Sequence, residues 1–266
     1  MSRDDVEFVN ELLRSTSLAG LTLAEQRAAM ERSALAPEVG TALEAVDANG
    51  VPAEWVVAPG VSGDAVLVSL HGGAFSVGSL VTNRRLAALL SGSTNRRVLS
   101  IGYRLAPEHP FPAALDDAIA GYRWLLDLGV SPGRIAIAGD SAGGGLALAT
   151  VVALRDLDVA LPAAAIGLSP WTDLTASGAS ISACATTDAL LTADGVRESA
   201  ALYADRSQYE HPWASPLFAD LRGLPPLLLQ ASRAEVLRDD TTRLAQRARD
   251  HGVDVTEQLY DDMPHV

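Results

Sequence analysis

The segment of this sequence most able to do chemistry is Gly139-Asp140-Ser141-Ala142-Gly143. It follows the apolar run 135–138 and precedes a helix-forming stretch over residues 144–155. A G-x-S-x-G turn between a strand and a helix is typical of a nucleophile elbow, in which glycines permit a tight turn that exposes the serine hydroxyl. The helix that begins there also directs free N–H groups toward a bound carbonyl. These features indicate that Ser141 is a nucleophile for acyl transfer.

A second glycine turn, His71-Gly72-Gly73-Ala74-Phe75, follows the apolar strand expected over residues 65–70. The oxyanion that develops during acyl transfer needs two or three N–H donors that are already in place, and glycines let the backbone approach that closely. We therefore expect the N–H groups of Gly72, Gly73 and Ala142 to form an oxyanion hole.

A serine nucleophile needs a general base, and the sequence contains five histidines. Four of them stand in the glycine turn, in two proline-containing loops and at the end of a polar helix. The fifth, His265, follows an alternating segment over residues 253–260 and a short loop. The last strand of such a sheet would deliver a base to the elbow at this point, in the chain order serine, acid, histidine. The sequence thus predicts His265 as the base.

The acid that orients the histidine is expected after the apolar strand 227–230. Glu235 stands just past the end of this strand, where loop residues converge on a site. Asp239 and Asp240 are the alternatives, one turn later, although acidic residues are also common in the first turn of a helix such as the one expected over residues 236–250. We favour Glu235, which would accept a hydrogen bond from the far imidazole nitrogen and stabilise the imidazolium.

These motifs resemble those of the bacterial hormone-sensitive-lipase family of carboxylesterases, which are α/β-hydrolases. The segments that carry the resemblance are 71–75, 103–113, 139–144, 169–173 and 215–217. The resemblance covers the chain from about residue 40 onward and implies an α/β-hydrolase fold and ester hydrolysis. The serine mechanism that it implies requires no cofactor.

The sequence departs from the family pattern in three places. Ala74 replaces the third glycine of the family's oxyanion motif and should narrow the pocket there. Glu235-Val236-Leu237 replaces the family's Asp-Pro-Leu, so that the longer acid must fold back to reach the histidine. Family members also continue past the histidine loop into a final helix, whereas this sequence ends at Val266. We expect an apolar patch where that helix would pack, and a homodimer formed through the patch.

Composition excludes several other classes of protein. The 20 basic residues are all arginine, which excludes a P-loop, a Schiff-base enzyme and a serine–lysine hydrolase. A net charge of −13 argues against a nucleic-acid partner, and the histidines show no metal-binding spacing. The single cysteine, Cys184, excludes an internal disulfide and is expected to fill space in the core. No apolar run is long enough for stable membrane insertion, and no signal-peptide pattern opens the chain, so we expect a cytoplasmic protein.

Strand and helix patterns alternate along the chain, which predicts an α/β fold with a mostly parallel sheet and helices on both faces. Strands are expected over residues 54–58, 65–70, 97–102, 135–139, 163–168, 227–230 and 253–259. Helices are expected over residues 83–91, 113–128, 144–155 and 236–250. The catalytic domain would comprise residues 46–174 and 214–266.

Two segments interrupt this alternation, and both are expected to form a helical cap over the site. Residues 1–45 would supply N-terminal cap helices, with a capping box at Thr22, and residues 175–213 would form a cap insertion. We expect apolar side chains to line the underside of the cap and contact substrate. The candidates are Phe8, Leu12, Trp213 and Leu217.

The sequence therefore predicts a serine esterase that acts on small-molecule esters of short to medium acyl chains. Lactone or amide hydrolysis could use the same groups. A non-catalytic small-molecule receptor of the same fold is the alternative from another class, because fold alone does not fix function. The presence of His265 favours the enzyme.

Overall fold

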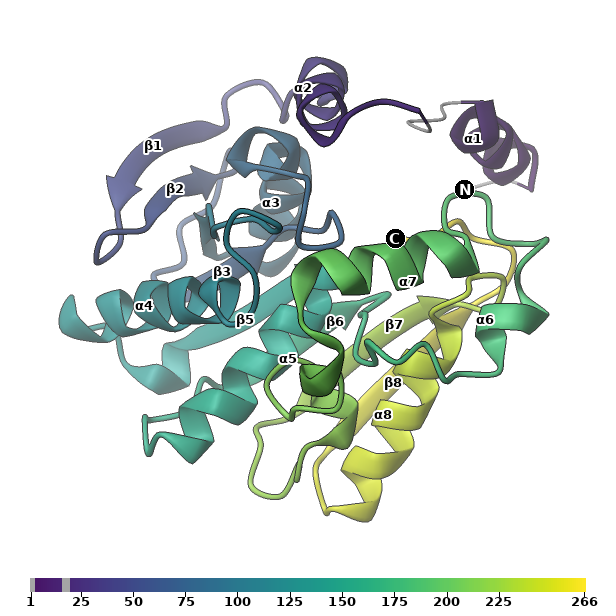
Figure 1. Ribbon diagram of the computed structural model, residues 1–266. Coiled ribbons are helices and arrows are strands. Elements are labelled where there is room, and N and C mark those ends of the chain that lie inside the picture. Colours follow the sequence, from purple (N-terminus) through teal and green to yellow (C-terminus); the bar gives the residue numbers. More distant parts are fainter. Residues whose placement is uncertain (1–2, 16–19) are drawn as a thin grey trace.

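The computed structural model describes residues 3–15 and 20–266, which are built around one eight-stranded sheet (Figure 1). The strand order is β1-β2-β4-β3-β5-β6-β7-β8. The strands are β1 Ala42–Asp47, β2 Pro52–Val57, β3 Val66–Leu70, β4 Arg97–Ile101, β5 Ile135–Asp140, β6 Ala164–Leu168, β7 Leu227–Ser232 and β8 Val255–Tyr260. The pairs β1·β2 and β2·β4 are antiparallel and all others are parallel. The prediction of a mostly parallel sheet is confirmed.

Helices cover both faces of this sheet. Helix α3 (Leu80–Thr94) packs on one face, against β2 and β4. On the other face lie α4 (Ala113–Asp127), α5 (Ser141–Asp156) and α8 (Arg238–Asp250). Side chains of β3 alternate between the two layers, since Val66 and Val68 join the larger cluster and Leu67 joins the smaller one beneath α3. This alternation follows from the period of two along a strand. The α/β-hydrolase architecture expected from the sequence is therefore present.

Strand β1 begins inside the segment 1–45 that the sequence predicted to be cap helices and ends at Asp47, beyond that segment. Its residues, Ala-Leu-Glu-Ala-Val-Asp, are mostly good helix formers and are exposed or half-buried in the structure. The strand forms because its backbone pairs with β2 over six residue pairs, from Ala42 with Val57 to Asp47 with Pro52. The predicted boundary at residue 45 is corrected, because the sheet begins at Ala42.

Four further helices lie toward the side of the sheet where the C-terminus is found (Figure 1). They are α1 (Arg3–Ser15) and α2 (Leu23–Ser33) before the sheet, and α6 (Ser180–Ala183) and α7 (Ala193–Tyr203) after β6. The predicted capping box of α2 is confirmed, since Thr22 and Glu25 bond each other's backbone N–H groups. Residues 1–2 and 16–19 of the expected cap lie outside the described residues. Short 3₁₀ helices occupy Pro132–Arg134, Arg206–Gln208 and Pro216–Phe218.

Helix α7 is attached to the glycine turn after β3 by aromatic packing. The ring of Phe75 stacks on that of Tyr203 with 3.6 Å between centroids. The N–H of Phe111 donates to the carbonyl of Tyr203 at 2.7 Å. The insertion therefore contacts the loop that the sequence assigns to the oxyanion. None of the helices in the described part of the chain combines the length and the apolar composition that a bilayer crossing requires.

Candidate active site

The turn between β5 and α5 holds Ser141 in a strained backbone conformation. Its φ is +52°, a region that residues with a side chain rarely adopt. Glycines on either side make this turn possible, because a Cβ on Gly139 would collide with the backbone of Gly143, and a Cβ on Gly143 would collide with the carbonyl of Leu70. The elbow is thus packed directly against the end of β3, with no side chain between the two backbones.

The structure brings the three predicted side chains together in one hydrogen-bonded chain. His265 Nε2 lies 2.9 Å from Ser141 Oγ, and His265 Nδ1 lies 2.6 Å from Glu235 Oε2. The other carboxylate oxygen, Oε1, accepts a hydrogen bond from the N–H of Ser232 at 3.0 Å. Glu235 and His265 are buried, with 1% and 5% of their surfaces exposed. In this arrangement the carboxylate fixes the imidazole so that Nε2 faces the serine hydroxyl.

Opposing effects act on the pKa of His265. Burial disfavours the charged imidazolium, but the hydrogen bond and negative charge of Glu235 favour it, as do the charges of Asp188 and Asp140. Their sum raises the pKa of His265 above its ordinary value. The imidazole is therefore a stronger base than one in water.

The two alternative acids have other partners. Asp239 accepts a hydrogen bond from the N–H of Ser180 at 2.9 Å and pairs with Arg238. Asp240 is fully buried and accepts hydrogen bonds from the N–H groups of Thr172 and Asp173. Both aspartates thus hold the segment after β6 to the start of α8, and only Glu235 contacts His265.

The glycine turn after β3 requires a correction to the expected oxyanion donors. The N–H of Gly72 donates to Asp140 Oδ1 at 2.9 Å, so this donor is already used. No hydrogen bond within the described residues uses the N–H groups of Gly73, Ala74 or Ala142. Ala74 replaces Gly72 as a candidate, although it bears a side chain in a left-handed conformation with φ of +51°. Burial raises the pKa of Asp140 to about 6.

His71 has a structural environment of its own. Its ring stacks on Tyr103 with centroids 4.2 Å apart, and its Nδ1 donates to the carbonyl of Gly72 at 2.7 Å. The hydroxyl of Tyr103 donates to the carbonyl of His71 at 2.6 Å. Burial lowers the pKa of His71 to about 4, so it remains neutral at pH 7. His71 therefore stabilises the conformation of the glycine turn.

Two cavities meet at Ser141. The larger, of about 590 Å³, includes His265. Its apolar wall includes Met30 of α2, Leu35 after it, Leu86 and Leu89 of α3, and Leu190 and Leu191 of the insertion. The smaller, of about 170 Å³, extends beneath α7. It is lined by Ala74, Trp171, Leu190, Leu191, Thr192, Gly195, Val196, Ser199 and Leu237 in addition to Ser141. Apart from Ala74 and Ser141, these wall residues were not predicted from the sequence.

The four residues predicted to contact substrate lie elsewhere. Leu217 is buried in the core and Trp213 donates from Nε1 to Asp156 Oδ2, near the end of α5 opposite Ser141. Phe8 and Leu12 are on α1, 67% and 52% exposed, and line neither cavity. None of the four lines either cavity at Ser141, because lining depends on how the cap segments fold over the sheet and not on apolarity alone.

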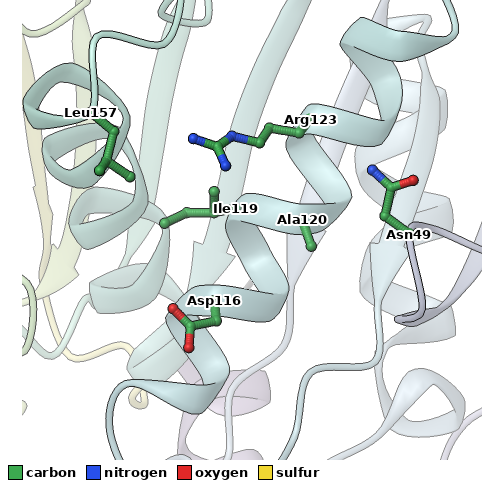
Figure 2. A pocket seen from close by; sticks show the side chains of 6 residues that line it. All are labelled: Asn49, Asp116, Ile119, Ala120, Arg123 and Leu157. Carbon is green, nitrogen blue, oxygen red and sulfur yellow. The ribbon is translucent and has the colours of Figure 1, made fainter.

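Another hollow, of about 370 Å³, does not include the serine. Figure 2 shows the residues that line it. It is lined by Asn49, Asp116, Ile119, Ala120, Arg123 and Leu157. Leu157 follows the far end of α5, which starts at Ser141 and is 16 residues long. At 1.5 Å per residue this helix separates the two places by about 24 Å. Within the described residues, no three acidic, histidine or cysteine side chains are grouped to hold a metal ion.

A hydrogen-bonded serine, histidine and carboxylate at the ends of parallel strands define this protein as an α/β-hydrolase with the geometry of a serine enzyme. Residues 67–266 match the family described as having the alpha/beta hydrolase fold. The chain belongs to this family and, within it, to the bacterial hormone-sensitive-lipase esterases, which are carboxylic ester hydrolases.

Individual relatives support this placement. An acetyl-hydrolase of Streptomyces hygroscopicus is 45% identical over 214 residues, which are 80% of this chain and 71% of that protein. An esterase of Acinetobacter venetianus is 39% identical, with the same coverage. A crystal structure of a bacterial hormone-sensitive-lipase esterase is 43% identical with a TM-score of 0.96, covering all of this chain and 91% of that one. EstE5, in crystals soaked with p-nitrophenyl butyrate, is 41% identical with a TM-score of 0.95, covering all of this chain and 90% of that one.

The three candidate acids lead to a ranked prediction. Glu235→Gln should lower kcat by on the order of a thousandfold or more, because triad members act as a unit. Asp239→Asn should change kcat by less than about threefold, since Asp239 does not contact His265. Asp240→Asn should also have little effect, because burial raises the pKa of Asp240 to about 8 and the carboxyl is largely protonated at pH 7. A larger loss in either Asn variant than in Glu235→Gln would move the acid to α8.

The raised pKa of His265 predicts the pH dependence of catalysis. The base must be neutral, so kcat/KM should fall as the pH decreases through the folded-state pKa, which lies above the ordinary imidazole value of about 6.5. Removing the charge of Glu235 with Glu235→Gln should shift this fall to lower pH, while Asp239→Asn should leave it in place. Profiles of kcat/KM between pH 5 and pH 9, about two units on each side of neutrality, would measure both. An unchanged profile in Glu235→Gln would contradict this explanation.

Proposed function

We propose that this protein hydrolyses carboxylic esters of short acyl groups through an acyl-enzyme on Ser141. The observation that supports this best is the continuous hydrogen-bonded chain from Ser141 through His265 to Glu235 where the two cavities meet. His265 Nε2 takes the proton of Ser141 Oγ as the oxygen attacks the ester carbonyl. The carbonyl oxygen becomes an oxyanion that accepts hydrogen bonds from the free N–H groups of Gly73, Ala74 and Ala142.

Collapse of this intermediate breaks the bond to the alcohol. The imidazolium of His265 gives its proton to the leaving oxygen, and the alcohol departs. Water then attacks the acyl-enzyme, with His265 again accepting a proton and returning it to Ser141 Oγ. The products are one carboxylic acid and one alcohol, and Glu235 stabilises the imidazolium in both halves without being protonated.

The two cavities suggest where each arm of the ester lies. Because His265 protonates the leaving oxygen, the alcohol arm should occupy the larger cavity, which His265 lines. The acyl arm then occupies the smaller cavity under α7. Its volume, about 170 Å³, is that of about six water-sized groups at roughly 30 Å³ each, which matches a short acyl chain. The acetyl-hydrolase activity of the Streptomyces relative agrees with this size.

Turnover of p-nitrophenyl butyrate by wild type and Ser141→Ala would test the mechanism. We expect Ser141→Ala to lose activity by a factor of about a million, as removal of the nucleophile does in other serine hydrolases. Ser199→Ala removes another hydroxyl at the small cavity and should remain within about threefold of wild type. An organophosphate should add to Ser141, as shown by peptide mapping. Full activity of Ser141→Ala, or an adduct at another residue, would disprove the acyl-enzyme.

The acyl-chain limit is tested at Val196, which is buried on α7 and lines the small cavity. Val196→Phe should fill this space and lower kcat/KM for the butyrate by about tenfold relative to the acetate, the effect of a methylene or two in an apolar pocket. Val196→Ala should favour chains longer than butyrate. Leu202→Ala, at an exposed position of the same helix, is the control and should leave chain preference unchanged. An unchanged preference in both Val196 variants would place the acyl chain elsewhere.

A further inference from the structure

Arg27, in the middle of α2, makes four hydrogen bonds to two loops of the hydrolase domain. Its Nε donates to the carbonyl of Ser76 at 2.8 Å, and its Nη2 donates to the carbonyl of Ala106 at 2.9 Å. The same guanidinium forms a bidentate pair with Glu108, at 2.8 Å and 2.7 Å. One side chain thus joins α2 to two segments that lie about 50 and 80 residues away in the sequence.

The two loops that Arg27 contacts, at Ser76 and Ala106, are both bonded to the glycine turn of the active site. Ser76 closes the glycine turn, since its N–H donates to the carbonyl of Gly73 at 3.0 Å. Ala106 is attached to the same turn, because its N–H donates to the carbonyl of Phe75 at 2.9 Å. Arg27 is therefore bonded to two segments attached to the turn that lines the cavity at Ser141.

Helix α2 has few other attachments. None of its residues is fully buried, and Leu23, Ala29 and Met30 are half-buried, so apolar packing alone gives α2 a limited attachment. Among the described residues, all other side-chain hydrogen bonds of α2 and its cap remain within residues 21–33. Met30, one turn beyond Arg27, and Leu35, just after the helix, nevertheless form part of the wall of the large cavity.

We propose that Arg27 is a positioning residue that determines specificity for the alcohol arm of the ester, by fixing the wall that Met30 and Leu35 contribute to the large cavity. This proposal rests on the proposed function, in which the alcohol arm occupies that cavity. An isolated surface ion pair stabilises a protein little, but here the guanidinium also bonds two backbone carbonyls in a fixed geometry. Lysine has a single ammonium in place of the planar fork and can restore only part of this contact.

The test uses the full chain and two acetate esters that differ only in the alcohol, methyl acetate and hexyl acetate. In Arg27→Ala we expect KM for hexyl acetate to rise about tenfold, the scale of a lost methylene contact in an apolar pocket, with kcat unchanged. The kcat/KM for methyl acetate should stay within about twofold, because a methyl group has little apolar surface to bury against this wall. Arg27→Lys should lie between Arg27→Ala and wild type.

Arg32→Ala is the matched control, because Arg32 is an exposed arginine of the same helix. It should behave as wild type with both esters. Glu108→Ala removes two of the four hydrogen bonds of Arg27 by changing its partner and not Arg27 itself. It should raise KM for hexyl acetate by a smaller factor than Arg27→Ala does. This variant keeps the test decisive if Arg27→Ala does not fold.

Several results would overturn the proposal. An equal rise in KM for both esters, or a fall in kcat at constant KM, would show that Arg27 acts through the glycine turn or general stability. If Arg27→Ala changed only the preference among methyl esters with different acyl chains, the wall formed by Met30 and Leu35 would contact the acyl arm and not the alcohol arm. If wild type and Arg32→Ala hydrolyse neither acetate although both are folded, the proposed function fails, and the role of Arg27 fails with it.

Discussion

The geometry of the site depends on close contact between two backbones that have no side chain between them. The elbow crosses the end of β3 so closely that a Cβ on Gly143 would meet the carbonyl groups of Leu70 and His71. This contact places the glycine turn beside Ser141 and lets Asp140 accept the N–H of Gly72. The hydrogen bond orients the turn, and the donors that remain free in the turn are those of Gly73 and Ala74. One steric constraint thus positions both the nucleophile and the candidate oxyanion donors.

The parts of the fold that the sequence predicted are those governed by local patterns. Each strand from β2 to β8 was expected within about three residues of its observed ends, because apolar runs and glycine breaks mark buried strands. The meeting of Ser141, Glu235 and His265 could also be predicted, since each follows a strand of a parallel sheet and those strand ends share one edge. In contrast, β1 has little sequence signal. It forms a strand because its backbone pairs with β2, and its exposed side chains carry no apolar pattern that would mark a strand.

The cavity walls could not be predicted for a related reason. Phe8, Leu12, Trp213 and Leu217 are apolar residues of the expected cap and its margin, as are Met30 and Leu191, and only the latter two line a cavity. What separates the two groups is the placement of helices over the sheet, which depends on contacts between distant residues such as Arg27 with Glu108 and Phe75 with Tyr203. The change of donor from Gly72 to Ala74 has the same origin, because it depends on the distant carboxylate of Asp140.

The glutamate at the acid position shows how a longer side chain is accommodated. Both oxygens of Glu235 are used, one by the N–H of Ser232 and one by His265, so that its buried charge is paired. The hydroxyl of Ser232 also donates to the carbonyl of Met263 at 2.6 Å, two residues before His265. Ser232 therefore bonds both the acid and the loop of the base. The extra methylene of glutamate is compatible with the triad because the strand end fixes the carboxylate and the histidine loop relative to one another.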